Sequence, residues 1–107
     1  MEDWIQVKGN TMTIRMPEEL DHCLAEQIRR DSDRILEQKN IREIIFDFRQ
    51  TTFMDSSGIG LLMGRYRQIY RLGGSVKVIH AGERVRKILK MSGVCRVIRL
   101  EEEKGWK

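Results

Sequence analysis

Apolar and polar residues alternate in two short stretches near the start of the chain, residues 4–7 and 12–16. Alternation with a period of two is typical of a β-strand that buries one face. Gly9 and Asn10 separate the stretches and favour a tight turn, so the pattern predicts a β-hairpin that ends at Pro17. The residues expected to face the core are Met12, Ile14 and Met16.

Three longer stretches repeat their apolar residues every three or four positions, which predicts amphipathic helices. The first opens at Leu20–Asp21, with Asp21 as its N-cap, and stops near Asn40. The second starts just before Ile59 and stops at Gly73–Gly74, and the third spans residues 83–91. The residues expected to face the core are Leu24, Ile28, Ile35 and Leu36; Ile59, Leu62, Met63, Tyr66, Ile69 and Tyr70; and Val85, Ile88, Leu89 and Met91.

Gly60 and Gly64 lie one turn apart inside the second predicted helix. Glycine in a helix costs about 1 kcal/mol relative to alanine. We therefore expect a close neighbour on that face, either another element of the fold or a partner protein.

Short apolar runs at residues 44–48, 76–79 and 97–100 alternate with these helices and predict strands. The predicted order is β-β-α-β-α-β-α-β, and strands that are joined through helices pair in parallel by right-handed crossovers. The sequence therefore predicts one α/β domain over residues 1–107, with helices packed on a mixed sheet.

The composition is that of an ordinary globular protein, with 40% hydrophobic and 34% charged residues. We find no long apolar run and no signal-peptide pattern at the N-terminus, so we expect a cytoplasmic protein. Cys23 and Cys95 lack metal-ligand spacing and are expected to be small buried residues. The net charge is +4, and the basic clusters at residues 65–71 and 84–90 are expected to be solvated faces of helices. Trp106 is expected to be loosely docked on the domain.

Residues 53–60, Phe-Met-Asp-Ser-Ser-Gly-Ile-Gly, join a predicted strand to the second helix. Asp55, Ser56 and Ser57 can each cap that helix, which is the common role of such a sequence. Two serines and an aspartate are more than one cap needs. A serine at an exposed helix start is suited to phosphorylation, which adds about −1.5 to −2 charges.

Other chemistries are less well supported by this turn. A nucleophilic serine needs a flanking glycine and a base, and the chain has only His22 and His80. A phosphate-binding loop needs a Gly-Lys-Ser/Thr sequence, which is absent. His22 and Cys23 are too few ligands for a metal. We expect no catalytic residue, no metal and no cofactor.

The turn and its continuation at residues 64–69, Gly-Arg-Tyr-Arg-Gln-Ile, resemble the STAS domains of bacterial anti-sigma factor antagonists, particularly those of sporulation. Residues 19–22 (Glu-Leu-Asp-His), 73–74 (Gly-Gly) and 91–93 (Met-Ser-Gly) match further family signatures, so the resemblance covers nearly the whole chain. It implies a STAS-type mixed β-sheet with helices packed on it.

The resemblance also implies a phosphorylation-controlled anti-anti-sigma factor rather than an enzyme. The unphosphorylated form would bind an anti-sigma factor that is also a serine kinase, with ATP or ADP bound to it, and would release the sigma factor. Phosphorylation of Ser56 would end this interaction, and a serine phosphatase would restore it. No direct contact with nucleic acid or membrane is implied. The expected partner-binding residues are Asp21, His22, Asp55, Ser56, Ser57, Ile59 and Gly60.

Two positions depart from the family pattern. Glu18 stands where the family usually has glycine, and the family's final helix is truncated after Leu100, which would leave one face of the sheet less covered. The resemblance implies that Asp21 contacts the kinase. The substitution Asp21→Ala is therefore expected to weaken kinase binding and to leave the melting temperature nearly unchanged.

The residues alone leave two alternatives: a small basic nucleic-acid-binding domain, and a hydrolase that uses Ser56.

Overall fold

The structure is a computed structural model that describes residues 4–101. Five strands form one sheet in the order β1-β2-β4-β6-β7. They are β1 (Ile5–Lys8), β2 (Thr11–Arg15), β4 (Glu43–Asp47), β6 (Ser75–Ile79) and β7 (Arg99–Leu100). β1 is antiparallel to β2, and the other neighbouring pairs are parallel. The predicted hairpin, the mixed sheet and the α/β class are therefore confirmed.

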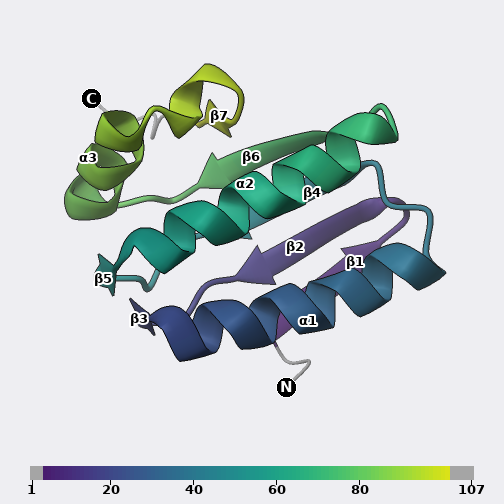
Figure 1. Cartoon of the computed structure of the whole chain (residues 1–107), viewed down its shortest axis with the longest axis horizontal. Helices are drawn as coiled ribbons and strands as arrows, with labels where there is room; N and C mark the ends of the chain where they lie inside the picture. The colour runs from purple at the N-terminus through teal and green to yellow at the C-terminus, as the bar shows by residue number, and fades with distance from the viewer. Residues whose placement is uncertain (1–3, 102–107) are drawn as a thin grey trace.

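Two helices cover one face of this sheet. α1 (His22–Gln38) and α2 (Ser56–Arg71) lie side by side across it, and α2 packs on β4 and β6 (Figure 1). α3 (Glu83–Ser92) and the short 3₁₀ helix η2 (Val94–Arg96) lie near one end of the sheet (Figure 1). None of the helices in residues 4–101 is long and apolar enough to cross a lipid bilayer.

The core lies between the sheet and the helices because alternate strand residues point toward α1 and α2. Met12 of β2 pairs with Ile44 of β4, and Ile44 pairs with Val76 of β6, so that apolar residues form a row across the sheet. The strand residues on this buried face include Met12, Ile14, Ile44, Phe46, Val76 and Val78. The predicted core positions of the hairpin are confirmed, including Met16, which follows β2.

The structure contains a second sheet, of two strands, that the sequence did not predict. β3 (Glu19–Leu20) and β5 (Phe53–Met54) pair in parallel. The first helix begins at His22, directly after Asp21, so the predicted N-cap is confirmed, and it ends at Gln38, close to the predicted stop near Asn40. A strand of two residues has no measurable alternation, so neither β3 nor β5 leaves a periodic signal in the sequence.

Four side chains that the sequence assigned to the core are exposed. Tyr70 is 63% exposed and Met91 is 79% exposed, and each lies in the last turn of its helix. Tyr70 instead stacks on Tyr66, with ring centroids 5.4 Å apart. Cys23 and Cys95 are also exposed. The expectations for Trp106 and for a shortened final helix concern residues beyond 101 and lie outside the described residues.

The expected close neighbour of Gly60 and Gly64 is not found within the fold. Among the described residues, a Cβ added at either glycine would meet no atom within 4 Å apart from its chain neighbours and the backbone of its own helix. The crowded position is Gly74, where a Cβ would overlap the backbone carbonyl oxygen of Arg42 and lie 2.6 Å from Cγ1 of Ile69. Both segments are held there, because the N–H of Ser75 donates to that carbonyl at 3.0 Å.

We predict that Gly74→Ala lowers the free energy of unfolding by about 1–3 kcal/mol, because the backbone at this contact has no room to retreat. Gly64→Ala is the matched control. It should leave stability unchanged or raise it by up to about 1 kcal/mol, since alanine favours the helix. Urea denaturation of the two variants measures the difference, and equal unfolding midpoints would contradict the prediction.

Candidate functional site

The small sheet places the starts of α1 and α2 next to each other. Leu20 of β3 lies opposite Met54 of β5, and the N–H of Asp55 donates to the carbonyl of Leu20 at 3.3 Å. The carbonyl of Glu18 accepts from the N–H of Thr52 at 2.8 Å. Glu18 therefore takes part in this pairing through its backbone, while its side chain is exposed.

An aspartate caps each of the two helices. Asp21 Oδ1 accepts from the N–H of Leu24 at 3.0 Å, and Asp55 Oδ1 accepts from the N–H of Ser57 at 2.8 Å. The two caps share nearly the same extended backbone, with φ −103° in both and ψ −175° and −170°. Asp55 is thus the cap among the three candidates in the turn, and both serine hydroxyls are left for other roles.

The two serines that follow Asp55 have different surroundings. Ser56 is exposed, and no described residue hydrogen-bonds its hydroxyl. Ser57 is half-buried, and its Oγ lies 3.5 Å from Nδ1 of His22 on α1. An enzyme or partner protein can therefore reach Ser56 directly, whereas Ser57 is turned toward the neighbouring helix.

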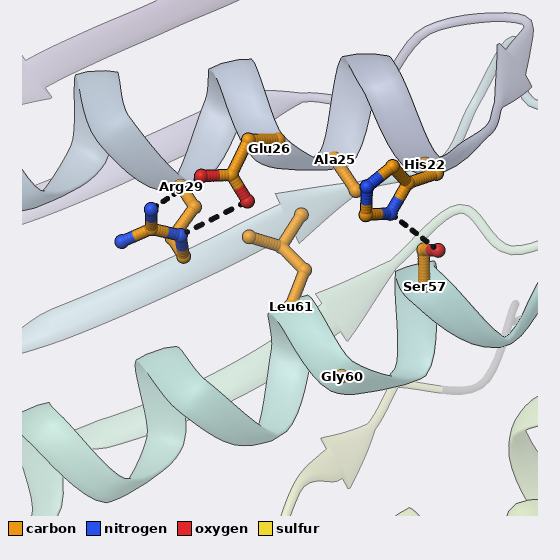
Figure 2. A pocket seen from close by; sticks show the side chains of 7 residues that line it. All are labelled: His22, Ala25, Glu26, Arg29, Ser57, Gly60 and Leu61. Carbon is orange, nitrogen blue, oxygen red and sulfur yellow. Dashed lines mark hydrogen bonds and ion pairs between the residues drawn. The ribbon is translucent and has the colours of Figure 1, made fainter.

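A groove of about 220 Å³ runs between α1 and α2 beside these serines. Figure 2 shows His22 pointing toward Ser57 at one end and Glu26 paired with Arg29 at the other. Gly60 is exposed in this groove, so the missing side chain keeps it open. The lining residues are His22, Ala25, Glu26, Arg29, Ser57, Gly60 and Leu61.

The structure brings most of the expected partner residues to this edge but not to one cavity. His22, Ser57 and Gly60 line the groove, whereas Asp21, Asp55 and Ser56 lie at the helix starts beside it. Ile59 is half-buried and packs against the core.

Gly58 has a packing role that the turn sequence did not reveal. It is buried, and an added Cβ would lie 2.9 Å from Cδ2 of Leu20 and 3.0 Å from Sδ of Met54. The glycine therefore lets the first turn of α2 lie directly on the small sheet.

A buried arginine joins the two helices. Arg65 is only 4% exposed, so the prediction that the whole 65–71 cluster is solvated is wrong. Its Nη1 donates to Ser32 Oγ at 3.0 Å and to the carbonyl of Arg29 at 3.2 Å. Its Nη2 lies 2.8 Å from a carboxylate oxygen of Asp33 and donates to Gln68 Oε1 at 3.0 Å.

Burial lowers the pKa of the Arg65 guanidinium, and the adjacent Asp33 carboxylate acts in the opposite direction. Arginine stays protonated because its ordinary pKa is so high. One sequence signal could have revealed the partner of this cation. Ser32 follows Ala25 and Ile28 at helical spacing, which puts a polar residue in the buried stripe of α1.

The geometry gives little support to hydrolysis. The serine that lies near a histidine is Ser57, not Ser56, and its 3.5 Å separation is long for a general base. Within residues 4–101, no group of three or more His, Cys, Asp or Glu side chains is arranged to hold a metal ion. The spare exposed hydroxyl of Ser56 fits a site of modification better than a nucleophile.

Comparison with known proteins decides the family. The model of the STAS domain family matches residues 5–105. The anti-sigma F factor antagonist of Lysinibacillus sphaericus is 35% identical over 88 residues, which is 82% of this chain and 75% of that protein. The chain belongs to the STAS family of anti-sigma factor antagonists.

Solved structures agree with this assignment. The STAS fold of the chain is similar to the anti-sigma factor antagonist SpoIIAA in its unphosphorylated form, with 30% identity, a TM-score of 0.75, and coverage of 94% of this chain and 89% of that one. It is also similar to the Bacillus cell fate determinant SpoIIAA in the phosphorylated form, with 33% identity, a TM-score of 0.72 and 92% coverage of each chain. The resemblance inferred from the turn is confirmed, and the alternatives of a nucleic-acid-binding domain and a hydrolase gain no support.

We predict that Asp21→Ala destabilises this STAS domain by about 0.5–2 kcal/mol, because Leu24 loses its capping acceptor. This revises the expectation that the melting temperature stays nearly unchanged, since about 1 kcal/mol corresponds to roughly 4–8 °C in a domain of this size. Asp21→Asn keeps a capping oxygen and should melt close to wild type. Thermal denaturation followed by circular dichroism compares the variants, and wild-type melting of Asp21→Ala would show that the cap contributes nothing.

Proposed function

We propose that the paired helix starts are the surface by which this antagonist binds its anti-sigma factor, and that phosphorylation of Ser56 closes that surface. The observation that carries the proposal is the exposed hydroxyl of Ser56. No described residue hydrogen-bonds it, because Asp55 already caps the helix. The proposed contact residues are Asp21, His22, Asp55, Ser56, Ser57, Ile59 and Gly60.

The known relatives support a two-state cycle. SpoIIAA has been solved in both an unphosphorylated and a phosphorylated form, so a protein of this fold accepts a phosphate. In the proposed cycle, which takes place in the cytoplasm, the anti-sigma factor is also the serine kinase. It binds the unphosphorylated protein and releases its sigma factor. It transfers phosphate from ATP to Ser56, and a serine phosphatase removes that phosphate.

The helix start explains why phosphorylation need not unfold the protein. A phosphate on Ser56 would lie at the positive end of the α2 dipole, near backbone N–H groups that favour an anion. The fold therefore tolerates the new charge at this position, and its effect falls on the partner.

Charge and desolvation then separate the partner. The phosphate adds about −1.5 to −2 charges to an edge that already carries Asp55 and, on the paired helix, Asp21. Burying that dianion under a partner surface that fits the uncharged hydroxyl would remove its water at a large cost in free energy. The unphosphorylated edge offers a small hydroxyl and the open groove at Gly60, which a partner side chain can enter.

We predict that the kinase places phosphate on Ser56 and not on Ser57, because the Ser57 hydroxyl is half-buried against His22. Incubation with the cognate anti-sigma factor and Mg-ATP, followed by peptide mass spectrometry, should locate the group. Ser57→Ala should still be phosphorylated, whereas Ser56→Ala should not. Phosphate found mainly on Ser57 would reject this assignment.

We also predict that negative charge at position 56 is enough to weaken binding. Ser56→Asp should bind the anti-sigma factor at least about tenfold more weakly than wild type, which corresponds to about 1.4 kcal/mol. Ser56→Ala should bind like wild type, and it cannot be inactivated by the kinase.

Ser56→Asn is the matched control for charge, because asparagine has the size of aspartate and is neutral. Titration calorimetry with the kinase in its ADP-bound state measures the affinities, and circular dichroism checks that each variant is folded. If Ser56→Asn and Ser56→Asp bind equally, size rather than charge closes the surface.

A further inference from the structure

The net positive charge of the chain belongs entirely to its C-terminal quarter. Residues 1–81 contain twelve basic and twelve acidic side chains, whereas residues 82–107 contain eight basic and four acidic ones. Six of those basic residues and two of the acidic ones lie in the described range 82–101. The charge is therefore segregated rather than spread over the surface.

Much of this charge is displayed on α3. Val85 and Leu89 are buried and attach the helix to the rest of the fold. Three basic side chains of α3 are exposed, and within residues 4–101 no salt bridge engages them. These residues, here called the basic face of α3, are Arg84, Lys87 and Lys90. Glu83 in the first turn is the single acidic residue of this helix.

The helix that carries the basic face lies beside the strand that leads to Ser56. α3 packs against β5, the strand that leads into the start of α2, and β3 lies on the other side of β5 (Figure 1). The segment at β3 carries three exposed acidic residues, Glu18, Glu19 and Asp21. The edge is therefore acidic at β3 and basic at α3, with the Ser56 turn between the two.

We propose that the basic face of α3 is a second part of the partner-binding surface, and that it takes an acidic surface of the anti-sigma factor. This inference rests on the proposed function. Exposed charges at the rim of an interface mainly raise the association rate and fix the orientation of approach. With opposite charges on its two sides, the edge favours one orientation of the partner, and that orientation places the partner over Ser56.

A protein fits this edge better than a polyanion does. A nucleic acid or an anionic membrane carries one sign of charge over its whole surface, so the acidic β3 side would repel it while α3 attracts it. A protein partner can present an acidic patch to α3 and a basic patch to β3.

The test measures the association and dissociation rates of the anti-sigma factor by stopped flow at several salt concentrations. The variant carries Arg84→Glu, Lys87→Glu and Lys90→Glu. At low salt its association rate constant should fall about tenfold or more, with little change in the dissociation rate. The difference should shrink toward about 1 M salt, where the Debye length is about 3 Å.

The matched control makes the same change in net charge elsewhere. Arg34→Glu, Lys39→Glu and Arg42→Glu alter three exposed residues around the C-terminal end of α1, at the far end of that helix from β3 (Figure 1). This control should slow association far less than the α3 variant does. Melting curves confirm that both triple variants are folded. Equal slowing by both variants, or no slowing by the α3 variant, overturns the inference.

Wild type and Ser56→Asp are measured alongside to separate the two proposals. If wild type fails to bind, or if Ser56→Asp binds like wild type, the proposed function fails and the inference fails with it. If those two behave as proposed and the α3 variant keeps wild-type rates, only the inference fails. Salt-dependent binding of wild type to duplex DNA that the α3 variant loses would assign the face to a polyanion and also overturn it.

Discussion

The parallel pairing of β3 with β5 holds the starts of α1 and α2 next to each other, where the proposed partner-binding surface lies. The hydrogen bonds of this pairing continue beyond the two strands. The Oγ1 of buried Thr51 donates to the carbonyl of Pro17 at 2.7 Å. This pairing sets two aspartate caps side by side and opens a groove between the helices that they start. Without it, residues 34 positions apart in the chain would have no reason to form one surface.

Structural roles and the proposed regulatory role at this edge fall on different residues. Asp55 caps α2, Gly58 allows close packing on the small sheet, and Arg65 ties α2 to α1 from inside the protein. None of these contacts uses the hydroxyl of Ser56. A charge can therefore be added at Ser56 while the interactions that hold the helix in place persist, which is what a reversible switch requires.

In the proposed switch, the arrangement of charge also favours one orientation of the partner. The acidic residues near β3 and the basic face of α3 flank one small hydroxyl, so a modification at Ser56 changes the balance between two existing fields. A phosphate on Ser56 would add negative charge between the acidic residues near β3 and the basic face of α3. It would therefore reduce the contrast in charge between the two sides. The same chemical event can thus weaken the contact at Ser56 and the steering that brings a partner to it.

The sequence by itself determined the hairpin, the three helices, the parallel direction of the strands that helices join and the capped turn at Asp55–Gly58, because each depends on local periodicity or on a few adjacent residues. It also carried the family signature. The tertiary structure alone decided which elements are neighbours. It paired the two-residue strands β3 and β5, buried Arg65 against Ser32 and Asp33, and left Met91 and Cys23 exposed. Periodicity shows which face of a helix is apolar, but burial at a helix end or a buried ion pair depends on segments far away in the chain.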